Sequence, residues 1–402
     1  MTSSHPPVLD FAADFDHMDP AWVADPYPIW DDLRHRCPIA HSDRYGGVWL
    51  PTRHEDISAI AYDTDHFSSR GVIVSELKPI IEAPVGPAPP ITSDPPFHSL
   101  ARRLLLPAFS PRAIAAWEPA TRQLCRDLLD GLGDADACDA AADYAQHIPP
   151  SVIARMLGLP PEDDGVFRDF VHHVIETVDA DPETRQAGFA RFDEYLDGHI
   201  AEHAAYPRDD LISYLLEAEI GGAHLSPTHV RGTVVLLLIA GVDTTWSAIG
   251  AALWHLGSHA DDRQRLVAEP ELMDRAVEEL LRAYAPVTMA RLVARDVELA
   301  GCPMKAGDWV LLPFPAANRD PDFFERADEV VIDRELNRHA AFGLGIHRCL
   351  GSNLARLEVR VAIEEWLSRF PDFEVTDQAA VMWASGQVRG PRQVPVRILA
   401  PR

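Results

Sequence analysis

The sequence predicts a mainly α-helical protein with small β-sheets, and three observations support this. Apolar residues recur with helical spacing in four segments, 98–109, 150–159, 165–178 and 270–284. A much longer helix is expected at 226–259, because Ser226 suits its N-cap and the proline that follows suits its first turn. The stretch 296–314 shows short strand-like runs with a glycine turn between them.

The proline-rich stretch at 79–96 is expected to form a long irregular loop. Each proline removes a hydrogen-bond donor and fixes φ, so this stretch cannot form one helix or an inner strand. Long loops inside compact domains usually serve a function. A linker between domains is the alternative, although the apolar residues of the stretch disfavour full solvation: Ile80, Ile81, Val85 and Ile91.

The composition indicates a soluble and strongly acidic protein. Its 62 acidic residues outnumber 36 basic ones, and the net charge of −26 would repel nucleic acids and anionic membranes. The five cysteines form no C-x-x-C pair, which favours free thiols in a reducing cytosol. Residues 1–20 carry acids where a signal peptide needs basic and then apolar residues. The apolar run 234–242 is shorter than the about 20 residues that span a bilayer. We therefore predict a cytoplasmic protein that binds neither nucleic acid nor membrane.

Polar residues interrupt the long helix at 240–246. The middle of this helix is apolar almost all round and should run through the core, so Asp243 is costly there unless it is paired or used in chemistry. Gly241 weakens the helix, and a threonine hydroxyl can compete for the carbonyl one turn earlier, near Ala240. A notch with Thr244 and the carboxylate side by side could deliver protons to a small molecule. The alternative is that the helix surfaces here and Asp243 is solvated.

Glu279 and Arg282 are three residues apart on one face of the helix expected at 270–284. This spacing permits a salt bridge, which would be a fixed structural pair if it were buried. The same spacing occurs at Glu335 and Arg338, and most such pairs lie on the surface. Taken alone, the spacing is therefore a weak indication.

Cys349 lies in the glycine-rich stretch AFGLGIHRCLG, residues 341–351, and four roles compete for it. It could be a buried structural thiol, a zinc ligand, a reactive nucleophile or the thiolate ligand of a haem iron. Zinc needs three or four ligands, and only His347 is near in the sequence. A nucleophile would sit at a helix N-terminus, and the residues after Leu350 do resemble a helix start.

The haem interpretation of Cys349 explains more of the sequence than the other three. Backbone amides of a glycine-rich loop that leads into a helix can stabilise a thiolate. Glycines also let the loop approach a flat macrocycle closely, and Phe342 can shield the sulfur from water. A haem would further give the polar notch at Asp243 and Thr244 a purpose.

The pattern F-G-x-G-x-H-x-C-x-G at 342–351 resembles the haem-ligand loop of the cytochrome P450 family of haem-thiolate monooxygenases. A-G-x-D-T-T at 240–245 resembles the oxygen-binding helix of that family. Glu279 and Arg282 are similar to its structural E-x-x-R pair. The cysteine loop is the most specific of these motifs, and the pair gains weight from its position upstream of the cysteine.

The resemblance extends over nearly the whole chain. His98 and Arg102, preceded by DPP, resemble the family's propionate-binding H-x-x-x-R. Further similar stretches lie at 25–34, 316–321 and 389–397. The resemblance implies a single cytochrome P450 haem domain over 1–402, with the long central helix over the haem and the cysteine-ligand loop on the opposite haem face.

The same resemblance implies haem b as the cofactor, with Cys349 as the axial thiolate and thus the metal ligand. Asp243 and Thr244 would be catalytic and relay protons to dioxygen. Glu279 and Arg282 would hold the fold around the cysteine loop. Arg295 is a rival for the place of Arg291 among the propionate ligands. The residues implied to bind the cofactor are His98, Arg102, Ala240, Gly241, Arg291, Phe342, Gly343, His347, Cys349 and Gly351.

The implied activity is insertion of one oxygen atom from O2 into a small or medium hydrophobic substrate. Electrons would come from a ferredoxin and its reductase. A basic patch could receive an acidic ferredoxin; its residues are Arg102, Arg103, Arg112, Arg348 and Arg356.

The substrate pocket implied by the resemblance is almost entirely apolar. It would be lined by Leu236, Ile239, Ala240, Val287, Met289 and Ala290. The loop at 72–92 and the residues Val381 and Met382 would close it. We expect no tight binding of a strongly anionic substrate unless Arg70 or Lys78 turns inward.

Three alternatives to this activity remain open at the level of sequence. A peroxide-driven haem oxygenase would share the fold, but such enzymes usually lack the acid and alcohol present at Asp243 and Thr244. A non-catalytic haem-binding gas sensor is the second, and the haem domain of a longer reductase fusion is the third. The sequence names neither the substrate, the site of oxidation nor the oligomeric state.

Overall fold

The computed structural model describes residues 5–74, 86–133, 135–160, 163–171, 182–384 and 386–400. The described α-helices are α1 (Pro20–Ala24), α2 (Tyr27–Arg36), α3 (His54–Tyr62), α4 (Phe97–Leu105), α5 (Pro111–Ala115), α6 (Glu118–Leu132), α7 (Ile148–Leu157), α8 (Asp164–Val171), α9 (Pro182–Ala205), α10 (Leu211–Glu217), α11 (Pro227–Ser258), α12 (Ala260–Ala268), α13 (Met273–Ala283), α14 (Phe314–Ala317) and α15 (Ser352–Arg369). The described strands are β1 (Ile39–Ser42), β2 (Val48–Pro51), β3 (Phe67–Ser68), β4 (Ala137–Asp139), β5 (Glu219–Ile220), β6 (Ala223–His224), β7 (Thr288–Val293), β8 (Val297–Leu299), β9 (Cys302–Met304), β10 (Trp309–Pro313), β11 (Asp372–Val375), β12 (Met382–Trp383), β13 (Pro391–Gln393) and β14 (Pro395–Ala400).

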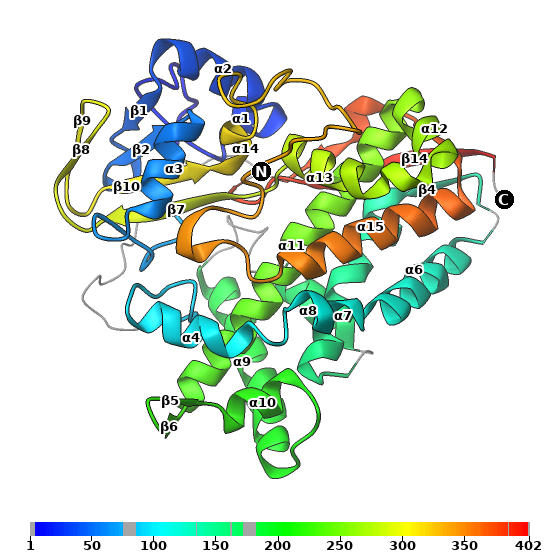
Figure 1. The fold of residues 1–402 in the computed structure, drawn as a ribbon, viewed down its shortest axis with the longest axis horizontal. Coiled ribbons are helices and arrows are strands. Elements are labelled where there is room, and N and C mark those ends of the chain that lie inside the picture. The colour runs from blue at the N-terminus through cyan, green and yellow to red at the C-terminus, as the bar shows by residue number, and fades with distance from the viewer. Residues whose placement is uncertain are drawn as a thin grey trace.

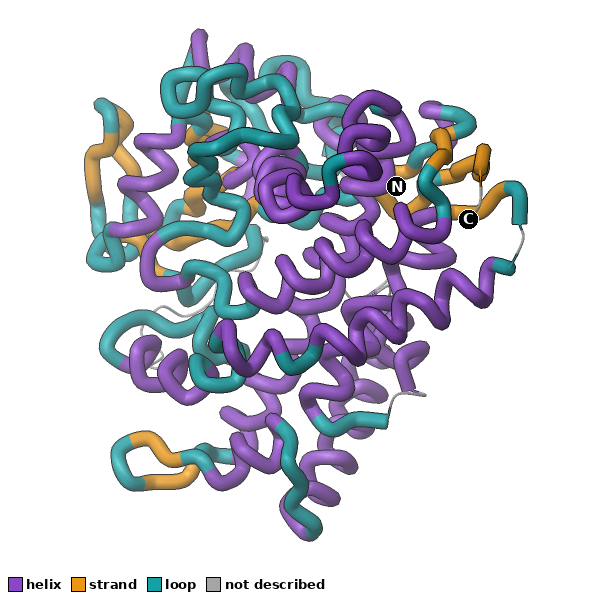
Figure 2. Tube along the Cα trace, turned by 45° about the vertical axis from the view of Figure 1, so that its right-hand side comes forward, coloured by secondary structure: helices purple, strands orange, loops and turns teal. Residues whose placement is uncertain are grey.

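The largest sheet has five strands in the order β1-β2-β10-β7-β3. It lies at the upper left of Figure 1 with α1, α2 and α3 beside it, while longer helices fill the lower and right-hand parts. Figure 2 shows the same division, with most strands in the upper part and a small hairpin at the bottom. The prediction of a mainly helical protein with small sheets is confirmed.

Helix α11 runs diagonally through the middle of the molecule and joins its two parts (Figure 1). Its start is as predicted, because the Ser226 side chain accepts a hydrogen bond from the backbone N–H of His229 at 3.1 Å. The helix is long and apolar enough to span a membrane by length and composition alone, but 61% of its most apolar window is buried in the protein. Such burial is what the central helix of a packed core requires.

The other predicted helices form with shifted ends. Helix α4 stops at Leu105, two residues before Pro107, and α7 stops where Gly158 adopts a left-handed conformation with φ of 79°. Helix α13 begins at Met273, after a 3₁₀ turn. The helix expected at 165–178 appears as α8, and residues 172–178 lie outside the described ranges.

The strand-like runs predicted at 296–314 are confirmed as β8, β9 and β10. Strands β8 and β9 form a hairpin, and β10 joins the five-stranded sheet between β2 and β7. Strand β10 pairs antiparallel with β7, which sets Val310 opposite Arg291 and Leu312 opposite Met289. Through this pairing, the sheet carries residues of β7 to the centre of the molecule.

Candidate active site

A cavity separates the middle of α11 from the cysteine loop at 341–351. Its volume is about 1420 Å³, with the space at its mouth included. The lining residues of α11 are Leu236, Leu237, Ala240, Gly241, Thr244, Thr245 and Ala248, and those of the loop are Ala341, Phe342, Gly343, Leu344, His347, Cys349, Leu350 and Gly351. The helix and the loop therefore face each other across this space.

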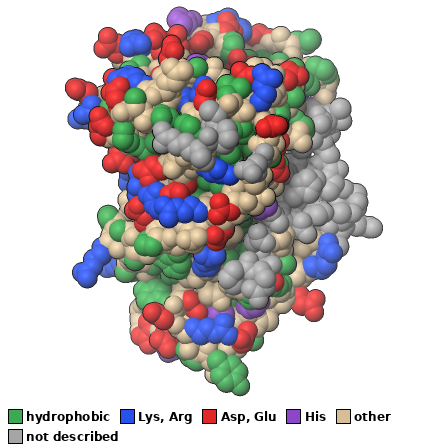
Figure 3. Space-filling view, turned by 90° about the vertical axis from the view of Figure 1, so that its right-hand side faces the viewer, with side chains coloured by type: hydrophobic (Ala, Val, Ile, Leu, Met, Phe, Trp, Pro, Cys, Tyr) green, Lys and Arg blue, Asp and Glu red, His purple; other side chains and the backbone are tan. Residues whose placement is uncertain are grey.

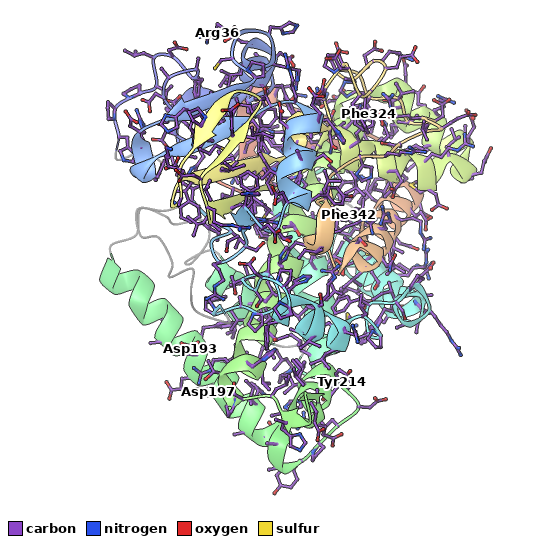
Figure 4. All side chains as sticks on the ribbon, turned by 60° about the vertical axis from the view of Figure 1, so that its left-hand side comes forward. Arg36, Asp193, Asp197, Tyr214, Phe324 and Phe342 are labelled. Atoms are coloured by element: carbon purple, nitrogen blue, oxygen red, sulfur yellow. The ribbon has the colours of Figure 1, made fainter. Side chains whose placement is uncertain are left out.

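Glycines fix the path of the cysteine loop. Gly343 and Gly345 have φ of 71° and 68°, which only glycine adopts at little cost. A Cβ on Gly345 would lie 2.2 Å from the carbonyl oxygen of Ala61 in α3, so no other residue fits there. The backbone N–H of Cys349 donates to the carbonyl of Phe342 at 2.6 Å, and Figure 4 shows Phe342 between the upper and lower parts of the molecule.

The Cys349 side chain is accessible to solvent and lines the cavity, so at least part of its accessible surface faces that space. Burial among protein atoms raises the pKa of its thiol, while the backbone N–H of Gly351 and the guanidinium groups of Arg102 and Arg348 act to lower it. No group of three or more potential ligands suited to a metal ion occurs among the described residues, which counts against the zinc alternative.

One end of the cavity gathers cationic and imidazole groups without acidic partners. The rings of His98 and His347 lie 4.2 Å apart; His347 lines the cavity and His98 does not. Neither nitrogen of His98 nor Nε2 of His347 has a hydrogen-bond partner in the part of the chain that the structure describes. Nη1 of Arg291 donates to the carbonyl of Ala290 at 2.7 Å. Within the described ranges, no carboxylate forms an ion pair with Arg102 or Arg291.

Burial explains the protonation states at this end. It lowers the pKa of His98 to about 4 and that of His347 to about 2, with the cations Arg102 and Arg291 adding to the effect. It also lowers the pKa of Arg291 to about 10. Buried donors of this kind need acceptors, and two carboxylates would satisfy them. The residues present thus fit the propionates of a haem, and Cys349 fits its axial thiolate.

The polar notch of α11 has its two side chains on different sides of the helix. The Thr244 hydroxyl donates to the carbonyl of Ala240 at 2.8 Å and lines the cavity, as predicted. Asp243 is 1% exposed and does not line it, so the alternative of a solvated carboxylate is wrong. The expected side-by-side arrangement is wrong too, because successive helical residues point about 100° apart.

The carboxylate of Asp243 is held by a residue that sequence reasoning missed. Arg392 of β13 donates to Asp243 at 2.5 Å and to the Ser247 hydroxyl at 2.9 Å. Its guanidinium also lies over the ring of Trp246, at 4.5 Å from the centroid. The side chain of Arg392 is 14% exposed, so the pair extends from the buried carboxylate towards the surface.

Four of the six predicted pocket residues line the cavity: Leu236, Ala240, Val287 and Met289. The other two, Ile239 and Ala290, do not. Ala290 follows Met289 in β7 and points to the opposite face of the sheet, where it packs with the N-terminal core. Ile239 is turned away from Ala240 by the helix and packs against the main core.

Only part of the loop expected at 72–92 to close the pocket belongs to the described residues, because 75–85 lie outside them. Pro90 and Ile91 line the cavity, but Val381 and Met382 do not. Arg70 is buried and donates to the carbonyl of Thr92 at 2.7 Å, outside the lining. Lys78 lies outside the described residues. Lining residues that sequence reasoning missed include Phe109, Ile153, Leu281, Pro286 and Phe314; only Pro286 had a signal, as a neighbour of Val287.

The E-x-x-R pair is fully buried. Arg282 donates to both carboxylate oxygens of Glu279 at 2.8 Å, and both side chains are 0% exposed. Arg282 also donates to the carbonyl groups of Asn318, Ala327 and Glu329. The pair thereby fixes the segment that leads to the cysteine loop, where Glu335 and Arg338 are exposed.

The sequence matches the family described as Cytochrome P450 over residues 164–382. Nocardicin C N-oxygenase of Nocardia uniformis subsp. tsuyamanensis is 36% identical over 372 residues, which cover 90% of this chain and 92% of that protein. The polyketide biosynthesis cytochrome P450 PksS of Bacillus subtilis is 33% identical over 367 residues, covering 87% of this chain and 89% of that protein.

Solved structures agree with the sequence comparisons. Cytochrome P450 PksS has a TM-score of 0.87 at 31% identity, covering 96% of this chain and 99% of that chain. CYP109E1 of Bacillus megaterium, solved in complex with testosterone, has a TM-score of 0.85 at 30% identity, covering 94% and 98%. This chain therefore has the cytochrome P450 fold and belongs to the cytochrome P450 family of monooxygenases, which use a haem with a cysteine thiolate as axial ligand and need O2, a substrate and electrons from a redox partner.

Proposed function

We propose that this monooxygenase oxidises a small or medium, neutral, hydrophobic substrate in the cytoplasm, with electrons from an acidic ferredoxin and its reductase. The observation that carries the proposal is the cavity between Thr244 and Cys349, whose lining outside the haem-ligand groups is almost entirely apolar. Thiolate-ligated haem, once bound, supplies the chemistry that activates dioxygen by favouring O–O cleavage.

Cys349 is proposed as the axial ligand, and the orphaned polar groups as the propionate ligands. His98, Arg102, Arg291 and His347 form that second set: His98 and Arg291 are buried, His347 and Arg102 are half-buried, and Arg102 also donates to the carbonyl of Arg348. Phe342, Gly343 and Gly351 would contact the macrocycle from the loop. Ala240 and Gly241 would leave room on the opposite side, because neither carries a side chain larger than a methyl group.

Thr244 and Asp243 are proposed to deliver protons to the cavity. The Thr244 hydroxyl lines the cavity, where its oxygen can accept a hydrogen bond from a water, and it can donate there when it leaves the carbonyl of Ala240. Asp243 can exchange protons with solvent through the partly exposed side of the ion pair with Arg392. This division gives each group one task, since one faces the cavity and the other faces the route to the surface.

The substrate is proposed to be neutral because no unpaired charge outside the propionate-binding end lines the described cavity. Arg70, which could have attracted an anion, is bonded to Thr92 instead. The names of the relatives are consistent with organic substrates of this size: one solved relative is bound to testosterone, and another is named a nocardicin C N-oxygenase.

The ferredoxin is proposed to dock on a basic cluster formed by Arg103, Arg112 and Arg348. These three are exposed and form no ion pair with any described residue. Arg356 leaves the predicted patch, because it is paired with Glu278 and stacked on Phe342. Leu106 is 48% exposed near the end of α4 and adds apolar contact area. Charge complementarity of this kind favours an acidic partner.

The first test is the absorption spectrum of the reduced protein under carbon monoxide. A strongly red-shifted Soret band is expected, because a thiolate donates electron density to the iron. Turnover is then compared with ferredoxin, reductase and O2 on one side and hydrogen peroxide on the other. A shifted band with turnover by peroxide alone would contradict the electron-transfer part of the proposal.

A further inference from the structure

The segment 86–92, here named the wall segment, approaches α11 more closely than a side chain would allow. A Cβ on Gly232 would lie 2.2 Å from the carbonyl oxygen of Pro87 and 3.1 Å from Cδ of Pro89. The next residue, Thr233, is 2% exposed and donates from its hydroxyl to the carbonyl of Pro89 at 3.2 Å. Gly232 thus leaves room for the carbonyl of Pro87 against α11, and the adjacent Thr233 binds the carbonyl of Pro89.

The other end of the wall segment is held by Thr92. The backbone N–H of Ala88 donates to the Thr92 hydroxyl at 3.0 Å, which closes the segment on itself. Arg70 donates to the carbonyl of Thr92 at 2.7 Å from outside. A Cβ on Gly86 would lie 2.2 Å from the same hydroxyl, so the segment is as tightly packed here as at α11.

Between these two anchors, Pro90 and Ile91 line the cavity. The same helix that anchors the segment at Gly232 and Thr233 supplies Leu236 and Ala240 to the cavity one and two turns later. The distance from these residues to Ile91 is therefore fixed by the close approach at Gly232. A change in this distance would alter the affinity for a bulky ligand that contacts both α11 and the wall segment.

We propose that Gly232 and Thr233 are positioning residues that determine substrate specificity by setting the place of the wall segment. They act on the substrate through Pro90 and Ile91 and touch neither it nor the haem. The ligand class is a neutral hydrophobic molecule with bulk that extends from the haem along α11 to the wall segment. This inference rests on the proposed function, because it concerns the ligand of the same cavity.

The test is the binding of imidazole, 1-phenylimidazole and clotrimazole to the haem-loaded protein. Binding is monitored by the shift of the Soret band that each ligand causes. The variant Gly232→Ala places a methyl group against Pro87 and must displace the wall segment. Imidazole is too small to reach that segment, so its Kd should stay within about twofold. The Kd of clotrimazole should rise about tenfold, as expected for a pocket misfit of methyl size.

Three further variants give the result its meaning. Gly198→Ala in α9 makes the same exchange where a Cβ would meet nothing within 4 Å, and it should leave all three Kd values unchanged. Thr233→Val loses the hydrogen bond to Pro89 and should raise the Kd of clotrimazole about fivefold. Thr233→Ser keeps the hydroxyl and should bind like the unaltered protein.

The outcomes separate this inference from the proposed function. If Gly232→Ala and Thr233→Val leave the ratio of clotrimazole to imidazole affinity unchanged, the inference is wrong, even where the carbon monoxide spectrum is that of a thiolate-ligated haem. An equal loss of affinity for all three azoles would also overturn it, because this would indicate general damage to the site. If Gly232→Ala fails to fold, the two Thr233 variants still decide the matter.

Discussion

The two walls of the cavity are built on different physical principles. The cysteine wall depends on buried charges, since Arg282 joins Glu279 to three carbonyls of the segment that leads to Cys349. The wall formed by α11 and residues 86–92 depends on apolar packing and close backbone approach, as at Gly232. In the cysteine wall, loss of one partner leaves a buried charge uncompensated. In the other wall, a substitution changes the distance between α11 and residues 86–92. The cysteine wall is therefore suited to a fixed cofactor, and the other wall to an adjustable specificity.

The largest effect is expected where this contrast is strongest, at Glu279. Glu279→Ala leaves Arg282 buried without a carboxylate, which should lower the free energy of unfolding by about 3–5 kcal/mol. Denaturant unfolding measures this loss. Glu335→Ala is the matched control, because Glu335 has the same spacing to Arg338 but is exposed, and it should change the free energy by less than about 0.5 kcal/mol. Equal midpoints for the two variants would contradict the contrast.

Asp243 is a buried charge in the wall formed by α11, and a substitution there tests whether it delivers protons. Asp243→Asn keeps the shape and removes the proton carrier, so turnover should fall about a hundredfold. The measurement is kcat in H2O and in D2O, and the variant should show the larger solvent isotope effect. A normal kcat would mean that Asp243 serves only to hold Arg392.

Thr244 should give a smaller loss of a different kind. Thr244→Ala removes the hydroxyl that lines the cavity, so electrons should be consumed without oxidising substrate, and product per electron should fall about tenfold. Peroxide release and product are measured together at the same rate of electron supply. Thr244→Ser restores the hydroxyl and should restore the yield; a variant as poor as Thr244→Ala would point to lost packing.

Substitutions in the basic cluster on the outer surface of the cysteine wall should weaken ferredoxin binding in a way that depends on salt concentration. Arg103→Glu with Arg112→Glu should raise the Kd for an acidic ferredoxin about tenfold at low ionic strength and less at high ionic strength. Arg155→Glu, an exposed arginine of α7 outside the cluster, is the control. On the face shown in Figure 3, acidic and basic side chains lie close to one another. Equal effects of both changes would remove the cluster as the docking site.

The smallest effect concerns Glu358 of α15, which is 2% exposed and whose Oε2 has no hydrogen-bond partner among the described residues. Burial raises the pKa of its carboxyl to about 8. The native state therefore binds the proton more tightly than the unfolded chain, so the contribution to stability is present at acid pH and is lost as pH rises towards about 8. Glu358→Gln should match the unaltered protein at pH near 5 and exceed its Tm by about 2 °C near pH 8. A constant difference at all pH values would contradict the shift.

The sequence predicted the parts of the molecule that local patterns determine. The cap at Ser226, the helix that it starts and the glycine loop around Cys349 are all local features. The structure places the middle of that helix opposite the loop. The buried state of Glu279 and Arg282 was not decided by their spacing, because their carbonyl partners lie 36 to 47 residues later.

What the sequence missed depends on direction and on distant contacts. Ile239 and Ala290 were expected in the pocket, but helical rotation and strand alternation turn them away by one position. Arg392 was missed because its partner Asp243 is 149 residues earlier and no local pattern relates the two. The position of Ile91 depends on Gly232, because only a residue without a side chain lets Pro87 pack against α11 at that point. The sequence alone does not show that Pro87 and Gly232 are in contact.

The hydrogen-bond acceptors of Arg282 are synthesised after Arg282 itself, during translation of the chain. The last of its three carbonyl acceptors, that of Glu329, is 47 residues further along the chain. At ribosomal speeds of roughly 5–20 residues per second, this charge waits about 2–10 s for its final acceptor. Cys349 follows Glu329 in the chain, so the residues of this support are synthesised before the cofactor ligand.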